Sequence, residues 1–286
     1  MALVASAAQA EPIPAPVAAM IEAAAGDAAK LGVVADIAKQ TNPASAAEID
    51  ARVAEINAAQ AKAREEKLAS QGLMDGWSGQ GEAGGFFSTG NTENRGVAVG
   101  VTVTKETRSW KHSVRALVDY QENEGVTSRE RYFAGYEGNW KFSQRGYVLL
   151  ALGYERDPFT GFNSRFSESI GIGYRVIDTK RLSLALEAGP SLRQTRFTDG
   201  VNDNVFAARG ALNAKWIIND ALTFTQNASI FHDEFNTSVY ALSALTARLS
   251  GKLSARFSFQ FNSESDPPTG RETVDTVTRA TLVYSF

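Results

Sequence analysis

Side chains at residues 253–262, LSARFSFQFN, alternate strictly between apolar and polar. The apolar members are Leu253, Ala255, Phe257, Phe259 and Phe261. Successive side chains of a β-strand point to opposite faces, so these five share one face and the polar residues between them share the other. The alternation recurs at 97–104, at 131–142 and at 275–286. This pattern restricts most of the chain to strands that have one apolar and one polar face.

About twelve such segments follow one another from Trp77 to the C-terminus, each with the roughly 9–12 residues that a tilted strand needs to cross a bilayer. They start near positions 77, 95, 111, 129, 146, 165, 181, 204, 221, 237, 252 and 272. The sequence therefore predicts an all-β fold, a transmembrane antiparallel up-and-down β-barrel of about twelve strands over residues 76–286, closed between the first and the last strand.

The connections between these segments fall into two classes. Those after the even-numbered segments are short, such as Asn219-Asp220 and Gly251. Those after most odd-numbered segments are longer and polar, at 121–128, 157–164, 195–203 and 263–271, with a brief exception at 233–236. Short turns at one end and long loops at the other are typical of an outer-membrane barrel.

The tryptophans support the same topology. Trp77 and Trp110 start segments and Trp140 and Trp216 finish them, so all four fall at the end with the short turns. Tryptophan favours the headgroup region of a membrane, where an apolar ring and a polar N–H are both accommodated.

The polar faces of the segments are strongly charged. A charge that faces lipid near the midplane costs about 2–4 kcal/mol, so this face must line the interior of the barrel. Both signs are present with a moderate excess of basic groups, which predicts internal ion pairs that narrow or close the lumen. The charged residues are Glu82, Arg115, Asp119, Arg131, Glu137, Lys141, Glu155, Arg175, Glu187, Arg193, Arg209, Lys215, Arg256, Asp275 and Arg279.

The N-terminal part of the chain is different in composition. Residues 1–10, MALVASAAQA, end in an A-x-A sequence and are read as a truncated signal peptide, the alternative being the start of a helix. Residues 11–75 are alanine-rich, without aromatic residues, and predict an α-helical N-terminal extension with helices at 14–25, 27–40 and 45–70. Ser45 and Glu48 have the spacing of a capping box.

The first predicted strand begins at the short-turn end, which places this extension in the periplasm. It is expected to pack loosely against the barrel mouth, a partner or another copy of itself. A flexible spacer is an equal alternative. A plug inside the barrel is less favoured, because the charged lumen of about twelve strands is crowded by its own side chains.

Composition excludes several other classes of protein. No run of 18 apolar residues occurs, so the sequence contains no helical membrane span. The mean hydropathy of −0.22 does not contradict a membrane barrel, because alternating strands average to ordinary values. Cysteine is absent, which suits a protein that crosses an oxidising compartment. The net charge of −3 gives no reason to expect a nucleic-acid partner.

Six segments of the chain, in order, resemble the salt-induced outer membrane protein family, the YdiY-like proteins of unknown function. They are GWSGQGEAGGFFSTGNTEN (76–94), RYFAGYEGNWKFS (131–143), YRVIDT (174–179), LEAGPSLR (186–193), SDPP (265–268) and TLVYSF (281–286). The resemblance covers the whole predicted barrel and implies a barrel in the outer membrane of a Gram-negative cell, and the family name implies a link to salt stress. It brings no catalytic or binding residues. The extension at 11–75 departs from typical members, which go almost directly from signal peptide to barrel. The terminal Phe286 resembles the signal by which the barrel-assembly machinery recognises its substrates.

Candidate catalytic and metal-binding residues are few. His112 and Ser113 are adjacent on a strand and point to opposite faces, so His112 is expected at the membrane interface beside Trp110. His232 and Asp233 could form an acid/base pair, although an omptin-like protease would need further carboxylates.

Asp199, Asn202 and Asp203 could offer oxygen atoms to calcium, but they lack the ordered spacing of a dedicated site. The Gly-x-Gly pairs at 79–81 and 171–173 are expected at crowded interior positions of strands. No catalytic, cofactor or metal residue is therefore assigned, and an enzyme is not expected.

Three classes of function remain open. The first is a structural barrel with a narrow or closed polar lumen that contributes to tolerance of salt or osmotic stress, with a narrow selective channel as its variant. A membrane-embedded hydrolase is the second, and a protein that recruits an unknown partner through its loops or helices is the third. The lipid bilayer and the barrel-assembly machinery are the partners that the sequence suggests.

Overall fold

A computed structural model of the chain describes residues 11–72, 75–89, 94–123, 126–267 and 269–286. The segment read as a signal peptide, 1–10, lies outside the described residues. Two compact units divide the chain, one ending at Gln71 and the other running from Gly72 to Phe286.

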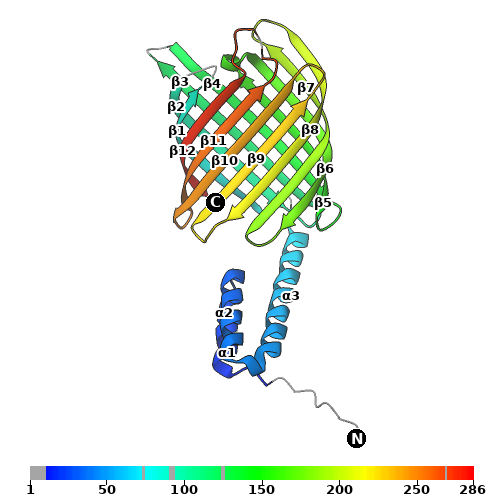
Figure 1. The fold of residues 1–286 in the computed structure, drawn as a ribbon, viewed down its shortest axis with the longest axis vertical. Coiled ribbons are helices and arrows are strands. Elements are labelled where there is room, and N and C mark those ends of the chain that lie inside the picture. Colours follow the sequence, from blue (N-terminus) through cyan, green and yellow to red (C-terminus); the bar gives the residue numbers. More distant parts are fainter. Residues whose placement is uncertain (1–10, 73–74, 90–93, 124–125, 268) are drawn as a thin grey trace. The chain divides into compact units, whose positions relative to one another are not determined.

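The second unit is a closed barrel of antiparallel strands (Figure 1). Its strands are β1 (Trp77–Thr89), β2 (Asn94–Glu106), β3 (Trp110–Asn123), β4 (Val126–Lys141), β5 (Gly146–Asp157), β6 (Phe162–Asp178), β7 (Leu182–Phe197), β8 (Asn202–Ile217), β9 (Leu222–His232), β10 (Thr237–Ser250), β11 (Leu253–Glu264) and β12 (Val274–Ser285). A short 3-10 helix, η2 (Pro158–Thr160), connects β5 to β6.

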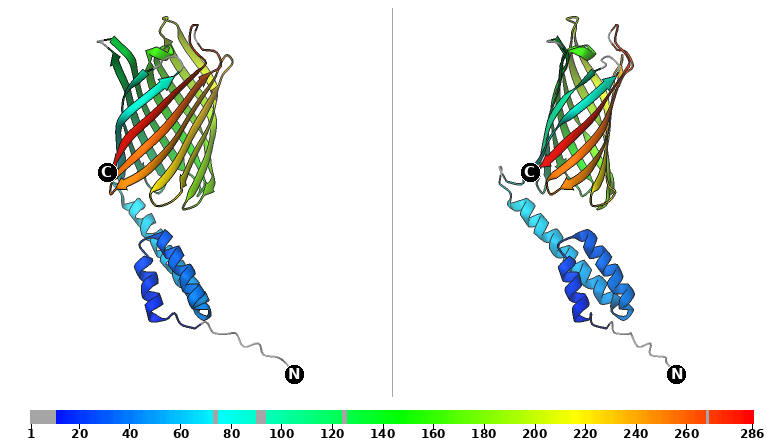
Figure 2. Two further views of the ribbon diagram at one scale, coloured as in Figure 1. Left: turned by 60° about the vertical axis from the view of Figure 1, so that its left-hand side comes forward. Right: turned by 90° about the vertical axis from the view of Figure 1, so that its left-hand side faces the viewer.

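Each strand pairs with its neighbours in the sequence, and β1 pairs with β12 to close the ring. The closing seam ends in two backbone hydrogen bonds between Gly79 and Phe286, with N···O distances of 3.1 and 2.9 Å. The tilted strands are seen from two further sides in Figure 2. The predicted fold, with twelve strands closed between the first and the last, is confirmed, and the largest errors in a predicted start are 129 against Val126 and 165 against Phe162.

The predicted long loops are mostly wrong. Strand β3 continues to Asn123 and β4 begins at Val126, and strands β7 and β8 cover much of 195–203 in the same way. Only the connection from Glu264 to Val274 stays long. The polar residues that suggested loops extend the sheet instead, because their backbone groups still pair across neighbouring strands. We call the end of the barrel that contains the connection from Glu264 to Val274 the loop end, and the opposite end the turn end.

Apolar side chains cover the exterior of the barrel. Phe257 is 57% exposed and Leu282 is 55% exposed, whereas Ser258 and Arg279, which alternate with such residues, are buried inside. The four tryptophans are 41–49% exposed and lie at the turn end, as predicted. An apolar exterior around a charged interior is the arrangement of a transmembrane barrel.

The two Gly-x-Gly pairs differ in their position. Gly171 and Gly173 face the interior, and a Cβ atom on Gly173 would lie 2.2 Å from the ring of Tyr147, as the crowding argument expects. For the pair at 79–81 the predicted interior position is wrong, although a Cβ atom on Gly79 would lie 2.5 Å from the ring of Phe286. Gly79 and Gly81 lie opposite Val103 and Val101 on the exterior face, and nothing lies within 4 Å of a Cβ on Gly81. Strand alternation from the charged Glu82 fixes this orientation, which the glycine spacing alone did not show.

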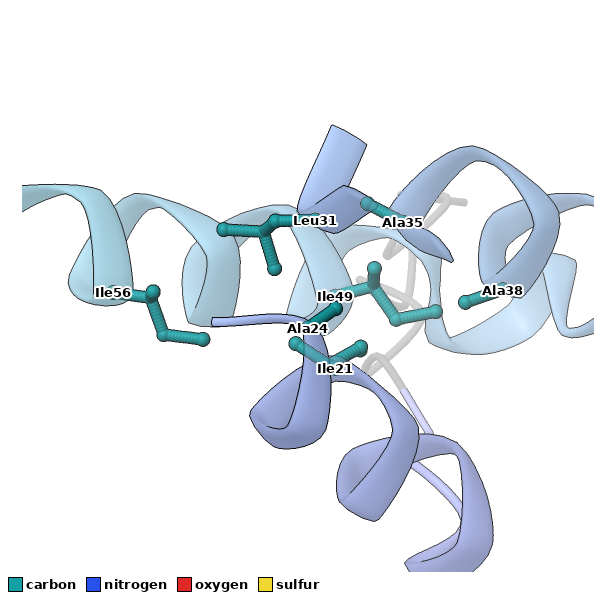
Figure 3. Close-up of a cluster of buried hydrophobic side chains, with 7 residues drawn as sticks. All are labelled: Ile21, Ala24, Leu31, Ala35, Ala38, Ile49 and Ile56. Atoms are coloured by element: carbon teal, nitrogen blue, oxygen red, sulfur yellow. The ribbon is translucent and has the colours of Figure 1, made fainter. Parts of the chain in front are cut away.

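The first unit is helical, with α1 (Ala15–Ala24), α2 (Ala28–Thr41), the 3-10 turn η1 (Pro43–Ser45) and α3 (Ala46–Ser70). None of the described helices is both long and apolar enough to cross a membrane. Its buried core, drawn in Figure 3, consists of Ile21, Ala24, Leu31, Ala35, Ala38, Ile49 and Ile56. Two ion pairs join the helices at the surface: Arg52–Glu22, 2.5 Å, and Lys39–Asp50, 2.9 Å.

Two details of the helix predictions are wrong. Ser45 donates a hydrogen bond to the carbonyl oxygen of Pro12, 3.3 Å away, and no side chain caps α3. The reason is that Ser45 belongs to η1, so its backbone lacks the extended conformation of a capping residue. The helical spacing of Ile49, Val53, Ile56, Ala59 and Ala63 predicts one apolar face along the third helix, but Ala59 and Ala63 are exposed, so the buried face ends at Ile56.

Candidate functional site

The lumen of the barrel contains most of the charged side chains of the described strands. Of the fifteen charged residues that the strand pattern placed inside, Asp119, Arg131, Glu187, Arg193 and Arg279 are buried. Lys215 is the exposed member, near the turn end of β8. The sequence did not predict which of these groups pair across the lumen.

A buried ion cluster occupies the wall formed by β12, β1, β2, β3 and β4. Arg279 on β12 donates hydrogen bonds to both oxygens of Asp119 on β3, at 3.2 and 2.6 Å, and to the Oε1 atom of Gln260 at 2.9 Å. Strands β1 and β2 lie between Arg279 and Asp119 in the sheet, and the residue of β2 that is paired with Asp119 is the small Ala98. Arginine suits this role because its planar guanidinium binds both oxygens of a carboxylate.

The cluster continues along β4 and β5. Arg131 lies 3.6 Å from Asp119 and 2.7 Å from the carboxylate of Glu155. Arg129 lies 3.6 Å from Asp157, and its guanidinium stands 5.6 Å from the ring centre of Phe86 on β1. Buried charges are tolerated only when they are paired and hydrogen-bonded, so this wall is polar but internally neutralised.

Contacts bridge opposite walls near the loop end. Arg165 on β6 forms an ion pair with Glu264 on β11, with a distance of 2.9 Å between the Nη1 and Oε1 atoms. Arg193 on β7 donates a hydrogen bond of 2.6 Å to Ser238 on β10. Five positions separate β6 from β11 in a ring of twelve strands, so these contacts cross the lumen.

The loops add a second bridge at the same end. Arg271, in the β11–β12 connection, donates a hydrogen bond of 2.6 Å to the carbonyl oxygen of Phe159 in η2. Asn236 at the end of the β9–β10 connection donates to Glu264 at 2.5 Å. The loop end is therefore held together by side chains from both sides of the opening.

Glu187 on β7 is the centre of a hydrogen-bonded group on the wall formed by β5, β7 and β8. Its carboxylate accepts hydrogen bonds from the hydroxyl of Tyr147 at 2.9 Å, from Arg209 at 3.1 Å and from Asn213 at 3.1 Å. Across the barrel, Glu82 on β1 pairs with Arg256 on β11 at 2.9 Å. The predicted internal ion pairs are thus present at several heights in the lumen.

A cavity of about 480 Å³ remains between these clusters. Its lining extends from Thr160 and Asp266 at the loop end down to Ser113 and Glu137. Strands β3 to β12 all contribute residues to its lining. A space of this size is within the range of binding sites for small molecules.

The candidate acid/base residues are not brought together. His232 accepts or donates a 2.9 Å hydrogen bond with the hydroxyl of Thr237, and it is exposed on the exterior side of β9, opposite Ala208. The Oδ1 atom of Asp233 instead accepts backbone hydrogen bonds from Phe235 and Asn236, at 3.0 and 2.8 Å, and so fixes the β9–β10 turn.

His112 lies where the aromatic pattern predicted. Its ring stacks on Trp110, with 5.6 Å between the ring centres, and its Nδ1 atom is 2.8 Å from the hydroxyl of Tyr136. These residues form an exterior aromatic group near the turn end, and Ser113 lines the cavity on the other face.

The three candidate calcium ligands do not form a site. In the β7–β8 connection, Asp199 accepts a backbone hydrogen bond from Val201 at 3.0 Å, and Asn202 and Asp203 already belong to β8.

Comparison with known proteins identifies the barrel. Residues 81–286 match the family described as "Protein of unknown function, DUF481". The chain belongs to this family. It is 23% identical over 205 residues to the uncharacterized protein YdiY of Escherichia coli (strain K12), a match that covers 71% of this chain and 81% of that protein.

The solved structure of a porin, NanC, supports the architecture of this DUF481 barrel. The NanC porin structure is similar with a TM-score of 0.50 and 10% identity, covering 71% of this chain and 98% of that chain. The translocator domain of the autotransporter NalP from Neisseria meningitidis has a TM-score of 0.47 and 11% identity, covering 84% and 98%. At these identities the likeness concerns the fold.

Sequence reasoning missed several residues that shape the lumen of this DUF481 barrel. Arg129, Asp157, Arg165 and Glu264 lie in or beside segments that were read as loops. Strand alternation continued through them and was the signal that could have placed them inside. Their polar neighbours concealed it, because a strand that extends beyond the bilayer loses its apolar exterior face.

Proposed function

We propose that this DUF481 barrel is an outer-membrane protein whose lumen is closed at rest by its own side chains, and that it serves the envelope as a structural element under salt or osmotic stress. The observation that carries the proposal is the Arg165–Glu264 ion pair, which joins opposite walls at 2.9 Å. The apolar exterior with its tryptophan band, the family membership and the porin-like fold all support the membrane location.

The charges of the lumen support closure. An open pore of one charge sign would leave its arginines free to attract ions, whereas these arginines are bound to carboxylates on neighbouring or opposite strands. Separating a buried ion pair leaves an uncompensated charge inside the protein. The free-energy cost of that charge maintains the closed arrangement.

Conductance in planar bilayers tests the closed lumen. Wild-type protein is expected to give no steady current above baseline, and Glu264→Gln is expected to give one, because Arg165 loses the carboxylate that holds it across the opening. Glu106→Gln is the matched control, since the Glu106–Lys141 pair lies at the turn end. A steady current through the wild type equal to that of Glu264→Gln contradicts the proposal.

A narrow selective channel is the second candidate, and the 480 Å³ cavity favours it. NanC, whose fold this barrel shares, is a porin by its name. A steady wild-type current with a fixed preference for cations or anions would support this candidate over the closed barrel.

The role in stress is tested in cells. A strain without the protein is expected to grow normally in ordinary medium and poorly at raised sodium chloride. A parallel culture at equal osmolarity in sucrose separates an effect of salt from an effect of osmotic pressure. Equal growth of both strains under all three conditions contradicts the stress role.

Two further parts of the proposal concern assembly. We propose that the helical unit lies in the periplasm, and the start of β1 at the turn end supports this. The barrel-assembly machinery is proposed to recognise the exposed aromatic ring of Phe286, which follows the closing strand. Removing Phe286 is expected to reduce the amount of folded protein in the outer membrane while leaving synthesis unchanged.

A further inference from the structure

Arg115 differs from the other lumen-facing arginines of the described strands. Eight of the others lie within 4.0 Å of a carboxylate oxygen, and Arg248, exposed at the turn end of β10, donates instead to the backbone oxygen of Asp220. The eight are Arg129, Arg131, Arg165, Arg175, Arg193, Arg209, Arg256 and Arg279. Arg115 has no carboxylate among the described residues at that distance. Its contact is the ring of Phe133, 6.0 Å from the guanidinium carbon.

The side chain of Arg115 lines the 480 Å³ cavity from strand β3. A guanidinium has five N–H donors and always carries its charge, so a partly buried one needs an anion or water to satisfy it. The ring of Phe133 attracts the cation through its face without occupying any of the N–H donors. Arg115 is therefore charged, has free donors and lacks an internal counter-ion among the described residues.

The rest of the cavity provides room for the uncharged part of a ligand. Phe133 flanks Arg115, and Phe231 and Tyr240 line the opposite wall. Asn227 on the same wall offers amide hydrogen bonds. Apolar and aromatic surface with a few convergent polar groups is typical of sites for small organic molecules.

Carboxylates also line the cavity, and some of them are already engaged in ion pairs. Glu155 is bound to Arg131 at 2.7 Å, and Glu264 is bound to Arg165 at 2.9 Å. Glu137 faces the same cavity and accepts a 2.8 Å hydrogen bond from Asn139, but it does not reach Arg115. An incoming carboxylate would meet Arg115 without displacing an existing ion pair.

We propose that this cavity binds a small organic carboxylate, with its carboxylate on Arg115 and its apolar or aromatic body between Phe133 and the wall that contains Phe231 and Tyr240. The site deepens the proposed function, since it requires a polar lumen reached from the loop end. It does not require that the solute pass through the barrel. A closed barrel with this site senses or holds its ligand, and a channel with this site selects it.

The experiment uses the full chain in detergent micelles, with benzoate as the anionic probe and benzamide as an uncharged probe of the same shape. Binding is measured by saturation-transfer NMR and by calorimetry. Benzoate is expected to bind saturably to the wild type, and benzamide is expected to bind about tenfold more weakly or worse, because it lacks the charge that Arg115 recognises. This comparison needs no variant and so cannot fail through misfolding. Equal binding of the two probes, or no saturable binding of benzoate, overturns the proposal.

Variants then locate the site. Arg115→Gln is expected to lower the affinity for benzoate by about tenfold or more, and Arg115→Lys by less, since the lysine keeps the charge and loses the planar donors. Arg175→Gln is the matched control, because Arg175 faces the lumen near the turn end and does not line the cavity. Glu137→Gln is expected to leave the affinity for benzoate unchanged or to raise it. Unchanged binding by folded Arg115→Gln overturns the assignment of Arg115.

Binding in micelles and conductance in bilayers are measured separately. A conducting wild type would therefore refute the closed barrel without refuting this binding site.

Discussion

Asp119 shows at the scale of one residue how the interior of this barrel is held. Its side chain is fully buried, and it accepts two hydrogen bonds from Arg279 while lying 3.6 Å from Arg131. One carboxylate thus neutralises parts of two guanidinium groups that come from β12 and β4. Removing one member of such a cluster leaves an uncompensated buried charge, so the cluster favours the strand register in which its members pair.

Removing this carboxylate is expected to destabilise the barrel strongly. Asp119→Ala should lower the free energy of unfolding by about 3–5 kcal/mol, because Arg279 and Arg131 remain buried without their partner. Asp178→Ala is the control, since the Arg175–Asp178 pair is partly exposed and should change stability by about 1 kcal/mol or less. Urea unfolding in micelles compares them, and equal midpoints for the two variants contradict the prediction.

A second prediction at this scale concerns two glycines of β1. A Cβ atom on Gly84 would lie 2.0 Å from the backbone oxygen of Ala280, whereas a Cβ on Gly81 would meet nothing within 4 Å. Backbone cannot move aside as a flexible side chain can, so Gly84→Ala is expected to cost about 1–3 kcal/mol through overpacking. Gly81→Ala should be nearly neutral. The temperature at which the folded band disappears on a gel measures both, and a barrel that tolerates Gly84→Ala as well as Gly81→Ala disproves the close approach.

At the scale of elements, helix α3 consists of two different halves. Ile49 and Ile56 in the first half are buried against α1 and α2, whereas the second half is exposed along its length apart from Leu68. Alanine buries little apolar area, so the three helices depend on a few isoleucine and leucine side chains for their packing. The unit therefore has a small core of its own, separate from that of the barrel.

The helical unit is expected to unfold without the barrel when this core is reduced. Ile49→Ala should destabilise the helices by about 2–5 kcal/mol, because a fully buried isoleucine is replaced by a small side chain. Ile37→Ala, at a residue that is 50% exposed, is the control. Limited proteolysis of the full chain should release the helices of Ile49→Ala first and leave the barrel fragment intact. Simultaneous digestion of both units would show that they do not fold independently.

At the scale of the whole molecule, the orientation in the membrane remains a prediction, and the absence of cysteine makes it easy to test. Phe235→Cys places a thiol at the loop end, where the native side chain is 70% exposed, and Lys180→Cys places one in an exposed turn. A membrane-impermeant maleimide added to intact cells should label Phe235→Cys alone, and Ala61→Cys in α3 should stay unlabelled until the outer membrane is opened.

The reverse pattern, with Lys180→Cys or Ala61→Cys labelled from outside, would invert the topology. The periplasmic placement of the helices would then be wrong. The cavity site would face the periplasm, but the binding experiment in micelles would keep its meaning.

The sequence by itself determined the barrel. Period-two alternation at residues such as Phe257, Ser258 and Phe259 decides which face meets lipid, because a charge on the lipid side is too costly. Turn residues such as Gly251, which has a φ of 44°, mark where strands reverse. These signals are local, so they can be read along the chain without knowing which strands meet.

Only the tertiary structure decided what the lumen contains. Alternation placed Arg115, Asp119 and Arg279 inside, but it could not show that Arg279 reaches Asp119 across two strands, that Arg165 crosses to Glu264, or that Arg115 is left beside a cavity. Such pairings depend on barrel closure and on the stagger between strands, which bring residues 99 and 160 positions apart within hydrogen-bonding distance. Interaction energy between two charges depends on their distance and surroundings, and neither is encoded in the local pattern of the sequence.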